Sequence, residues 1–174
     1  TGQNAGKKLL SSSDNIAIGR LTASFNNVTG NYNIMFGNRA GSKLTSGSQN
    51  IFLGASAGRY VTSGARNFVA GTQSSYCLTL GNDNIGIGAC TNRCLTIGSD
   101  NIAIGRCANY SDVCTWGNIA IGHSAGYHAN ATNYRENISI GSTAGGGGAC
   151  NIAIGVRALS NCGTTGGQNI AIGM

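Results

Sequence analysis

The chain has no proline, and charged residues make up only 9% of its 174 residues. Without proline or a Gly-x-y period it is not a collagen helix, although it contains 29 glycines. No stretch approaches the roughly 20 consecutive apolar residues of a membrane-spanning helix, and no signal peptide is visible. Low charge with many small polar residues is typical of disordered linkers, but such linkers do not place aliphatic residues at regular intervals, as this chain does.

Basic residues outnumber acidic ones, with eleven Lys and Arg against five Asp and Glu and a formal net charge of +6. They are scattered along the chain, and only Lys7 and Lys8 are adjacent. A nucleic-acid groove needs a concentrated basic face with aromatic partners, so we expect solvated surface charges and no nucleic-acid partner. The net charge still favours attraction to an anionic polysaccharide or membrane surface, without membrane insertion.

A five-residue motif, Asn-Ile-x-Ile-Gly or a close variant, occurs ten times at spacings of 14 to 19 residues. A repeat that runs from end to end is typical of a stacked solenoid rather than a globular domain. The asparagines that begin the ten copies are Asn15, Asn33, Asn50, Asn67, Asn84, Asn101, Asn118, Asn137, Asn151 and Asn169. We expect their side chains to form a hydrogen-bonded ladder along the stack; alternatively, asparagine is there only because it tolerates turn geometry.

Each motif predicts a short strand that ends at a glycine turn. The two aliphatic residues are two apart and share one face of an extended chain, while the residue between them points the other way. A second strand is expected in four repeats, over residues 44–47, 61–64, 78–81 and 95–98. Repeats this short and rich in glycine do not favour helices. The predicted fold is therefore an all-β, parallel β-solenoid (β-roll) of about ten rungs of 14–19 residues, about 45–50 Å long.

Residues 1–13 are expected to be an N-terminal lead-in, and residues 14–174 the repeat domain of a longer fibre. We place the aliphatic pair of each motif inside the coil. The first members of these pairs are the predicted structural core: Ile16, Ile34, Ile51, Phe68, Ile85, Ile102, Ile119, Ile138, Ile152 and Ile170.

The third motif position then points outward, and it is never charged. An uncharged stripe along a rod predicts a buried interface between chains, although small residues could also simply fit a tight strand. The predicted interface residues are Ala17, Met35, Phe52, Val69, Ala103, Ala120, Ala153 and Ala171. Since a three-fold arrangement suits a fibre, we expect a homotrimer.

The repeated NIAIG, followed by segments such as NRAGSKLTSGSQ and ASAGRYVTSGAR, resembles the head repeats of trimeric autotransporter adhesins. It is also similar to longer-period repeats in phage and large-virus tail fibres. The resemblance covers residues 14–174. It implies a left-handed parallel β-roll with three chains side by side, which serves as a shaft or head at a virion or cell surface.

Seven cysteines are present, and two pairs of them occupy equivalent positions in successive repeats. Stacking would bring Cys77 near Cys94 and Cys90 near Cys107, at a separation that suits a disulfide. Further candidate disulfides join Cys107 to Cys114 or Cys150 to Cys162. Disulfides would place the chain outside the cytosol; the alternative is stacked, unpaired thiols.

No motif in the chain predicts catalysis or a bound cofactor. The spacing Cys90-x3-Cys94 lacks the further ligands of a metal site, and no metalloprotease, phosphate-binding or hydrolase motif is present. We expect no enzyme activity, metal or cofactor. Because insertions in repeat proteins map to exposed faces, the longest repeat supplies the candidate ligand loop: Tyr127, His128, Asn130, Tyr134 and Arg135.

The predicted function is that of a structural and attachment protein, which presents loops to host receptors or glycans. Two alternatives remain. Thr45, Thr62, Thr79 and Thr96 form a regular column that would suit an ice-binding solenoid. A polysaccharide-depolymerising fibre is the other, although only five carboxylates are available for such chemistry.

Overall fold

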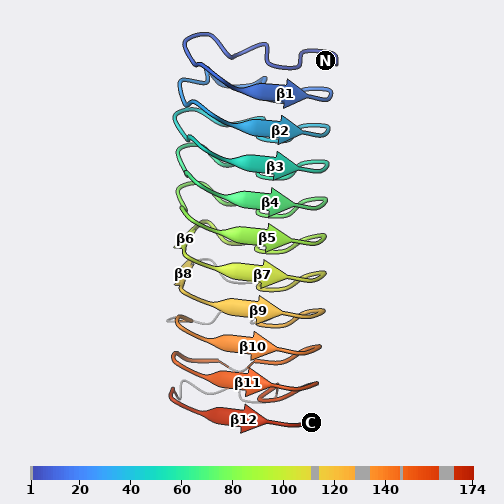
Figure 1. The fold of residues 1–174 in the computed structure, drawn as a ribbon, viewed down its shortest axis with the longest axis vertical. Coiled ribbons are helices and arrows are strands. Elements are labelled where there is room, and N and C mark those ends of the chain that lie inside the picture. The colour runs from blue at the N-terminus through green and yellow to red at the C-terminus, as the bar shows by residue number, and fades with distance from the viewer. Residues whose placement is uncertain (1, 111–113, 128–133, 146, 161–166) are drawn as a thin grey trace.

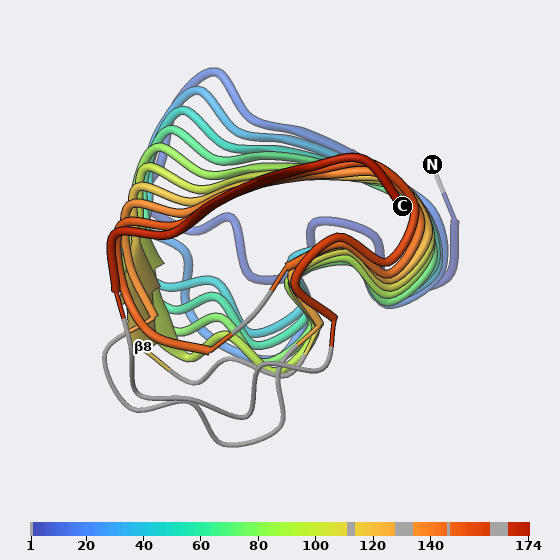
Figure 2. The same cartoon turned by 90° about the horizontal axis from the view of Figure 1, so that it is seen from below.

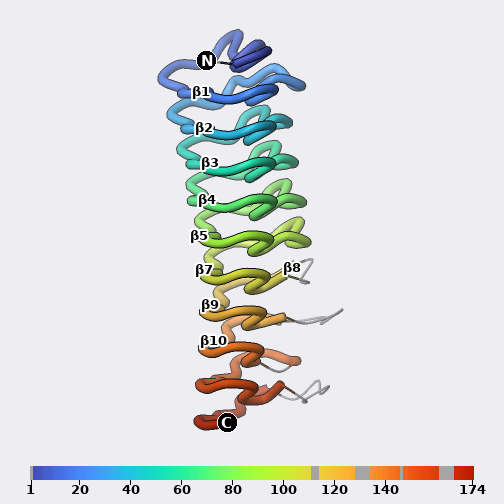
Figure 3. The backbone as a smooth tube through the Cα atoms, turned by 90° about the vertical axis from the view of Figure 1, so that its right-hand side faces the viewer, coloured from blue at the N-terminus to red at the C-terminus, as the bar shows by residue number. Residues whose placement is uncertain are grey.

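The computed structural model describes residues 2–110, 114–127, 134–145, 147–160 and 167–174. The chain winds into a rod of stacked turns (Figures 1 and 3). Ten motif strands form one parallel sheet: β1 (Ile16–Ile18), β2 (Ile34–Phe36), β3 (Ile51–Leu53), β4 (Phe68–Ala70), β5 (Ile85–Ile87), β7 (Ile102–Ile104), β9 (Ile119–Ile121), β10 (Ile138–Ile140), β11 (Ile152–Ile154) and β12 (Ile170–Ile172).

Each motif strand pairs in parallel, and in register, with the same positions of the next motif, as in Ile16 with Ile34 and Ile102 with Ile119. The described residues contain no helix. The prediction of an all-β parallel solenoid is confirmed. Seen along the rod axis, the strands form one wall of the coil and the connecting segments return along the other (Figure 2).

The second predicted strand exists only in part. Its one described pair is β6 (Ile97–Ser99) with β8 (Cys114–Trp116). At residues 44–47, 61–64 and 78–81 the prediction was wrong, because the chain bends there. The bends still stack through backbone hydrogen bonds, such as Thr45 N to Thr62 O at 2.8 Å. Regular stacking therefore does not require extended geometry at every position.

The two faces of the motif strands are the reverse of the prediction. Third-position side chains such as Met35, Phe52 and Val69 are fully buried within the single chain. The flanking residues point outward, with Ile16 50% and Ile104 36% exposed. The residues predicted as core therefore lie on the outer face: Ile16, Ile34, Ile51, Phe68, Ile85, Ile102, Ile119, Ile138, Ile152 and Ile170. The residues predicted as an oligomer interface instead line the interior: Ala17, Met35, Phe52, Val69, Ala103, Ala120, Ala153 and Ala171.

The narrow width of the coil explains this reversal. The third-position residues face a second, fully buried row from the returning segment, which includes Ala40 and Ala57. Leu44, Val61 and Leu78, also at 0% exposure, belong to the same buried cluster. The interior accepts one strand side chain per turn, so two bulky aliphatic residues from each motif would overfill it.

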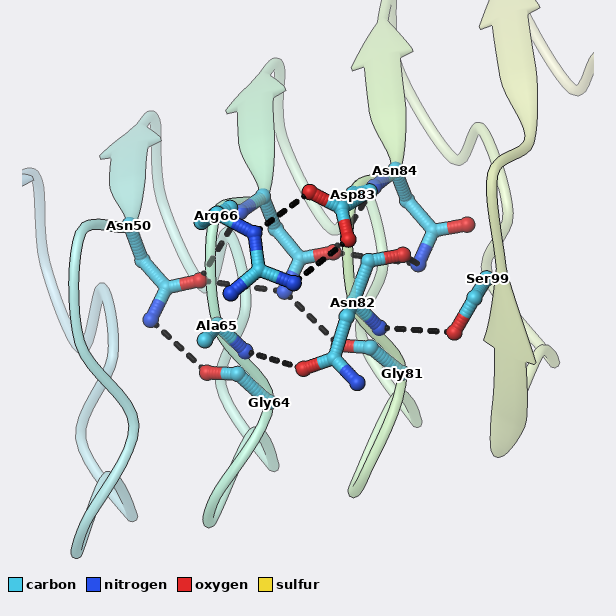
Figure 4. A network of polar contacts seen from close by, with 10 residues as sticks. Asn50, Gly64, Ala65, Arg66, Gly81, Asn82, Asp83, Asn84 and Ser99 are labelled. Atoms are coloured by element: carbon cyan, nitrogen blue, oxygen red, sulfur yellow. Dashed lines mark hydrogen bonds and ion pairs between the residues drawn. The ribbon is translucent and has the colours of Figure 1, made fainter.

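The ten asparagines form a continuous ladder beside the core. Asn50 Nδ2 lies 3.0 Å from Asn33 Oδ1, and the same contact recurs between Asn67 and Asn50 and between Asn84 and Asn67. Each of these amides also donates to a carbonyl of the following turn, as Asn50 does to Gly64 O at 2.8 Å. Figure 4 shows part of this network. The ladder satisfies buried polar groups that would otherwise destabilise a thin core.

The glycine that ends each motif is required by geometry. Gly54, for example, has φ of +131°, where side-chain-bearing residues are strained. A Cβ on Gly54 would also lie 2.7 Å from the carbonyl oxygen of Gly71 in the next turn. Glycine is therefore required here for two reasons: the predicted turn geometry, and the close approach of the backbones of successive turns.

The lead-in adds a partial turn at the N-terminal end of the rod. Gly6 N donates to Thr22 O at 2.9 Å, and Leu21 N donates to Gln3 O at 2.9 Å. Leu9 packs against the nearest buried cluster. The first motif turn is therefore covered by residues that contain no motif of their own.

Candidate functional site

The described part of the chain has few features of a catalytic or metal centre. No group of three or more His, Cys, Asp or Glu side chains in it could hold a metal ion. The same residues include no helix long and apolar enough to cross a membrane. The candidate sites are therefore surfaces, and two of them run along the rod.

The first is the outer strand face, formed by the second and fourth positions of all ten motifs. None of its twenty side chains is polar or charged: Ile16, Ile18, Ile34, Phe36, Ile51, Leu53, Phe68, Ala70, Ile85, Ile87, Ile102, Ile104, Ile119, Ile121, Ile138, Ile140, Ile152, Ile154, Ile170 and Ile172. Their exposure in the single chain is 39% at Ile87, 56% at Phe36 and 75% at Ile172 at the C-terminal end. The face is about 45 Å long, since nine rung spacings separate its ends. An unbroken apolar strip of this length is unusual for a monomer.

The second is a cation–aromatic column on the connecting segments, formed by Lys43, Arg59, Tyr60, Tyr76, Arg93 and Tyr110. The Arg59 guanidinium lies 5.3 Å from the Tyr60 ring centre and 5.5 Å from that of Tyr76. Arg93 lies between Tyr76 and Tyr110, at 5.4 Å and 5.7 Å. The Nη1 atoms of both arginines donate to tyrosine hydroxyls, Arg59 to Tyr76 at 2.8 Å and Arg93 to Tyr110 at 2.9 Å.

The sequence carries a signal for this column that the motif alone does not contain. Arg59, Tyr76, Arg93 and Tyr110 are each 17 residues apart and follow their motif asparagine by nine positions. Stacked repeats place such residues directly above one another, so alternating cations and rings become neighbours. Aligning the repeats at this position would have predicted the column.

The predicted ligand loop is only partly described. Tyr127 is 47% exposed and stacks on Tyr110 with ring centres 5.5 Å apart. Arg135 is exposed. His128 and Asn130 lie outside the described residues.

The placement of Tyr134 in that loop surface was wrong, because it is 1% exposed and its hydroxyl lies 3.2 Å from Ser139 Oγ. Nearby interior positions are occupied by small residues such as Ala120 and Ala125. The tyrosine side chain therefore fills interior volume beside these small residues.

In the threonine column proposed for ice binding, the described hydroxyl groups donate hydrogen bonds to backbone carbonyls of the chain itself. Thr45 Oγ1 donates to Thr62 O at 2.8 Å, Thr62 to Thr79 O at 3.1 Å and Thr79 to Thr96 O at 2.9 Å. These hydroxyl groups support the stacking of the turns. Their outward donor capacity is correspondingly reduced.

The six described cysteines are free thiols: Cys77, Cys90, Cys94, Cys107, Cys114 and Cys150. Burial raises the pKa of Cys77, and a nearby Cys94 raises it further. Burial likewise raises the pKa of Cys90, with Cys107 as the next cause. Both predicted pairs are therefore electrostatic neighbours, although no disulfide joins them.

The predicted Cys150–Cys162 pairing cannot be placed, because Cys162 lies outside the described residues. Cys150 Sγ donates to Glu136 Oε2 at 3.4 Å. This hydrogen bond, followed by burial, raises the pKa of the Cys150 thiol.

No carboxylate of the residues that the structure describes pairs with the cation–aromatic column. The ion pair between Arg66 and Asp83, 2.7 Å between Nε and Oδ1, is the only one among the residues described (Figure 4). The hydrogen bond from Arg66 lowers the pKa of Asp83. Lys43, Arg59 and Arg93 thus have no carboxylate partner within the described chain.

Comparison with known proteins identifies no relative: no family model, curated protein or solved structure matches the chain. The β-solenoid fold is consistent with a structural repeat protein.

Proposed function

We propose that this chain is a structural segment of a homotrimeric fibre, the shaft or head of a viral, phage or cell-surface attachment protein. In this proposal three rods associate through their outer strand faces. The connecting segments remain outward, where they present their side chains to a host receptor or glycan. Several weak contacts on one fibre then combine into strong attachment.

The unbroken apolar outer strand face is the observation that supports this proposal most directly. It runs along the whole ten-stranded sheet, and exposing it to water is unfavourable at about 25 cal/mol per Å² of apolar surface. A second copy of the same chain matches it in length, register and repeat. Closed symmetry allows each copy to bury its strip against the others. The third motif position cannot take this role, because its side chains are already inside the coil.

Light scattering coupled to size-exclusion chromatography tests the oligomer directly. We expect a molar mass three times that of the 17.6 kDa chain, under both reducing and non-reducing conditions. A single-chain mass at micromolar concentration would overturn the proposed homotrimer.

An oxidising location at a virion or cell surface is part of the proposal, and the cysteine pairs test it. With oxidised glutathione we expect Cys77 to pair with Cys94 and Cys90 with Cys107. Each step forms one S–S bond, releases two protons and transfers two electrons to the glutathione disulfide. Each disulfide closes a 17-residue loop, which corresponds to about 3 kcal/mol of added stability.

Mass spectrometry of non-reduced peptides identifies these pairings, and thermal unfolding reports the gain in stability. Since the pKa values of Cys77 and Cys90 are raised, less thiolate is present at neutral pH, and cross-linking should accelerate as pH rises. The exposed Cys114 is the control and should react with an alkylating reagent first. Thiols that stay unpaired through oxidation at alkaline pH would contradict the prediction.

A further inference from the structure

We propose that the cation–aromatic column binds a linear sulfated polysaccharide laid along the rod axis. This inference rests on the proposed attachment role, because it names the class of ligand that one outward surface of the fibre would recognise. The surface lies on the connecting segments, which return along the wall opposite the strands (Figure 2). Association through the outer strand face therefore leaves it accessible.

The column holds its cations in fixed positions. Lys43 Nζ lies 4.4 Å from the Tyr60 ring centre, and each arginine is held between two tyrosine rings. All six residues are partly exposed. Side chains already ordered by stacking lose less conformational entropy when a ligand binds.

The positive charge of the column is not neutralised within the described chain. The Nε atoms of Arg59 and Arg93 are buried and have no hydrogen-bond acceptor. The titratable groups acting on Arg93 are Tyr110, Cys90 and Cys94, and none is a carboxylate. Among the described residues, an anionic ligand would therefore meet no competing negative group at the column, and it would form charge-assisted hydrogen bonds there.

The spacing of the cations fits a polysaccharide. Arg59 and Arg93 are two turns apart, which corresponds to about 10 Å along the axis. This is comparable with one disaccharide unit of an extended glycan. The column offers only three cations. A polysaccharide with an anion on nearly every sugar ring can pair with these cations in any register. Sulfated chains meet this condition, whereas a chain with one carboxylate per disaccharide meets it in one register only.

Nucleic acid fits the column less well. Single-stranded nucleic acids owe much of their binding to bases that stack on open aromatic faces. Here Lys43, Arg59 and Arg93 lie over the tyrosine rings, and Tyr60 and Tyr76 contact each other with ring centres 5.0 Å apart. The bases would find these rings already occupied.

Heparin serves as the sulfated probe, with binding measured by calorimetry at physiological ionic strength. We expect the double variant Arg59→Gln and Arg93→Gln to bind at least tenfold more weakly than the unmodified chain. The control pair, Arg106→Gln and Arg157→Gln, removes the same charge from exposed positions off the column and should change affinity less than twofold to threefold. Chemically desulfated heparin, hyaluronan and a single-stranded oligonucleotide should bind far more weakly than heparin.

Equal losses in the two variant pairs, no heparin binding, or equally tight binding of the oligonucleotide or hyaluronan would overturn the inference. A footprinting experiment on the unmodified chain tests the same inference without any variant that could misfold. Bound heparin should protect Arg59 and Arg93, but not Arg106, from an arginine-modifying reagent. Light scattering on the same samples separates the two proposals. Trimers that do not bind heparin overturn the ligand class alone, whereas single chains that bind it overturn the proposed trimer alone.

Discussion

Replacing one ladder asparagine by its isosteric acid, Asn84→Asp, should destabilise the rod by about 3–5 kcal/mol at pH 7. Asn84 is fully buried, and its Nδ2 atom lies 3.0 Å from Asn67 Oδ1 and 2.7 Å from Gly98 O. Its oxygen accepts from Asn101 Nδ2 at 3.0 Å. Asn84 Nδ2 also lies 3.0 Å from Asn82 O. A carboxylate keeps the acceptor role but cannot donate, so it would face three oxygens as a buried charge.

The loss of stability in Asn84→Asp should become larger as pH rises. Burial and neighbouring oxygens would raise the pKa of the introduced carboxyl in the folded chain above its unfolded value of about 4. At a pH below the unfolded-state pKa, the carboxyl is protonated in both the folded and the unfolded chain and can donate one hydrogen bond. As pH rises from 4 to 7, stability falls, because the folded state binds more protons than the unfolded state. Denaturant unfolding at fixed protein concentration across this range measures the effect.

A change two residues away provides the matched control. Asn82 is half-buried, and its side-chain oxygen accepts from Ala65 N at 2.8 Å (Figure 4). A carboxylate can make that same contact. Asn82→Asp should therefore change stability by about 0.5 kcal/mol or less, with little dependence on pH. Equal losses in the two variants would show that the ladder contributes nothing specific.

The repeat period predicted the architecture because stacking converts sequence spacing directly into position. Equivalent residues such as Asn67 and Asn84 must lie one turn apart once the strands pair in register. The glycine turns could be predicted for the same reason. The bends at 44–47 and 61–64 could not, because their stacking depends on backbone hydrogen bonds that a bend satisfies as well as a strand does.

The orientation of the strands could not be predicted from alternation alone. A period of two distinguishes two faces but does not say which one is enclosed. The width of the coil decides this, and it depends on the opposite wall. The buried Ala40 and Ala57 on that wall lie outside the motif, four residues after the ends of β2 and β3. Small residues at the third position, including Gly86, were the available signal for a narrow interior. The prediction of an interface at this position followed from placing the larger aliphatic pairs inside the coil.

This reversal determines where a charge should disrupt the proposed trimer. In Ile87→Glu with Ile104→Glu, both carboxylates lie on the outer strand face, where the isoleucines are 39% and 36% exposed in the single chain. The isolated coil should tolerate them, because they do not enter the core. In the proposed trimer they would be buried without partners, which costs several kcal/mol. We expect the molar mass to fall from three chains to one, with an unchanged β-type circular dichroism spectrum.

Leu80→Glu with Ile97→Glu makes the same chemical change away from the ten-stranded sheet. These side chains are 50% and 44% exposed, so both double variants lose two surface aliphatic residues and gain two negative charges. The control should keep the trimer mass, because its carboxylates face water in either state. Light scattering over a concentration series should show that the Ile87/Ile104 double variant associates at least about 100-fold more weakly than the Leu80/Ile97 control. Trimers that persist with glutamate at both 87 and 104 would show that the outer strand face does not join the chains.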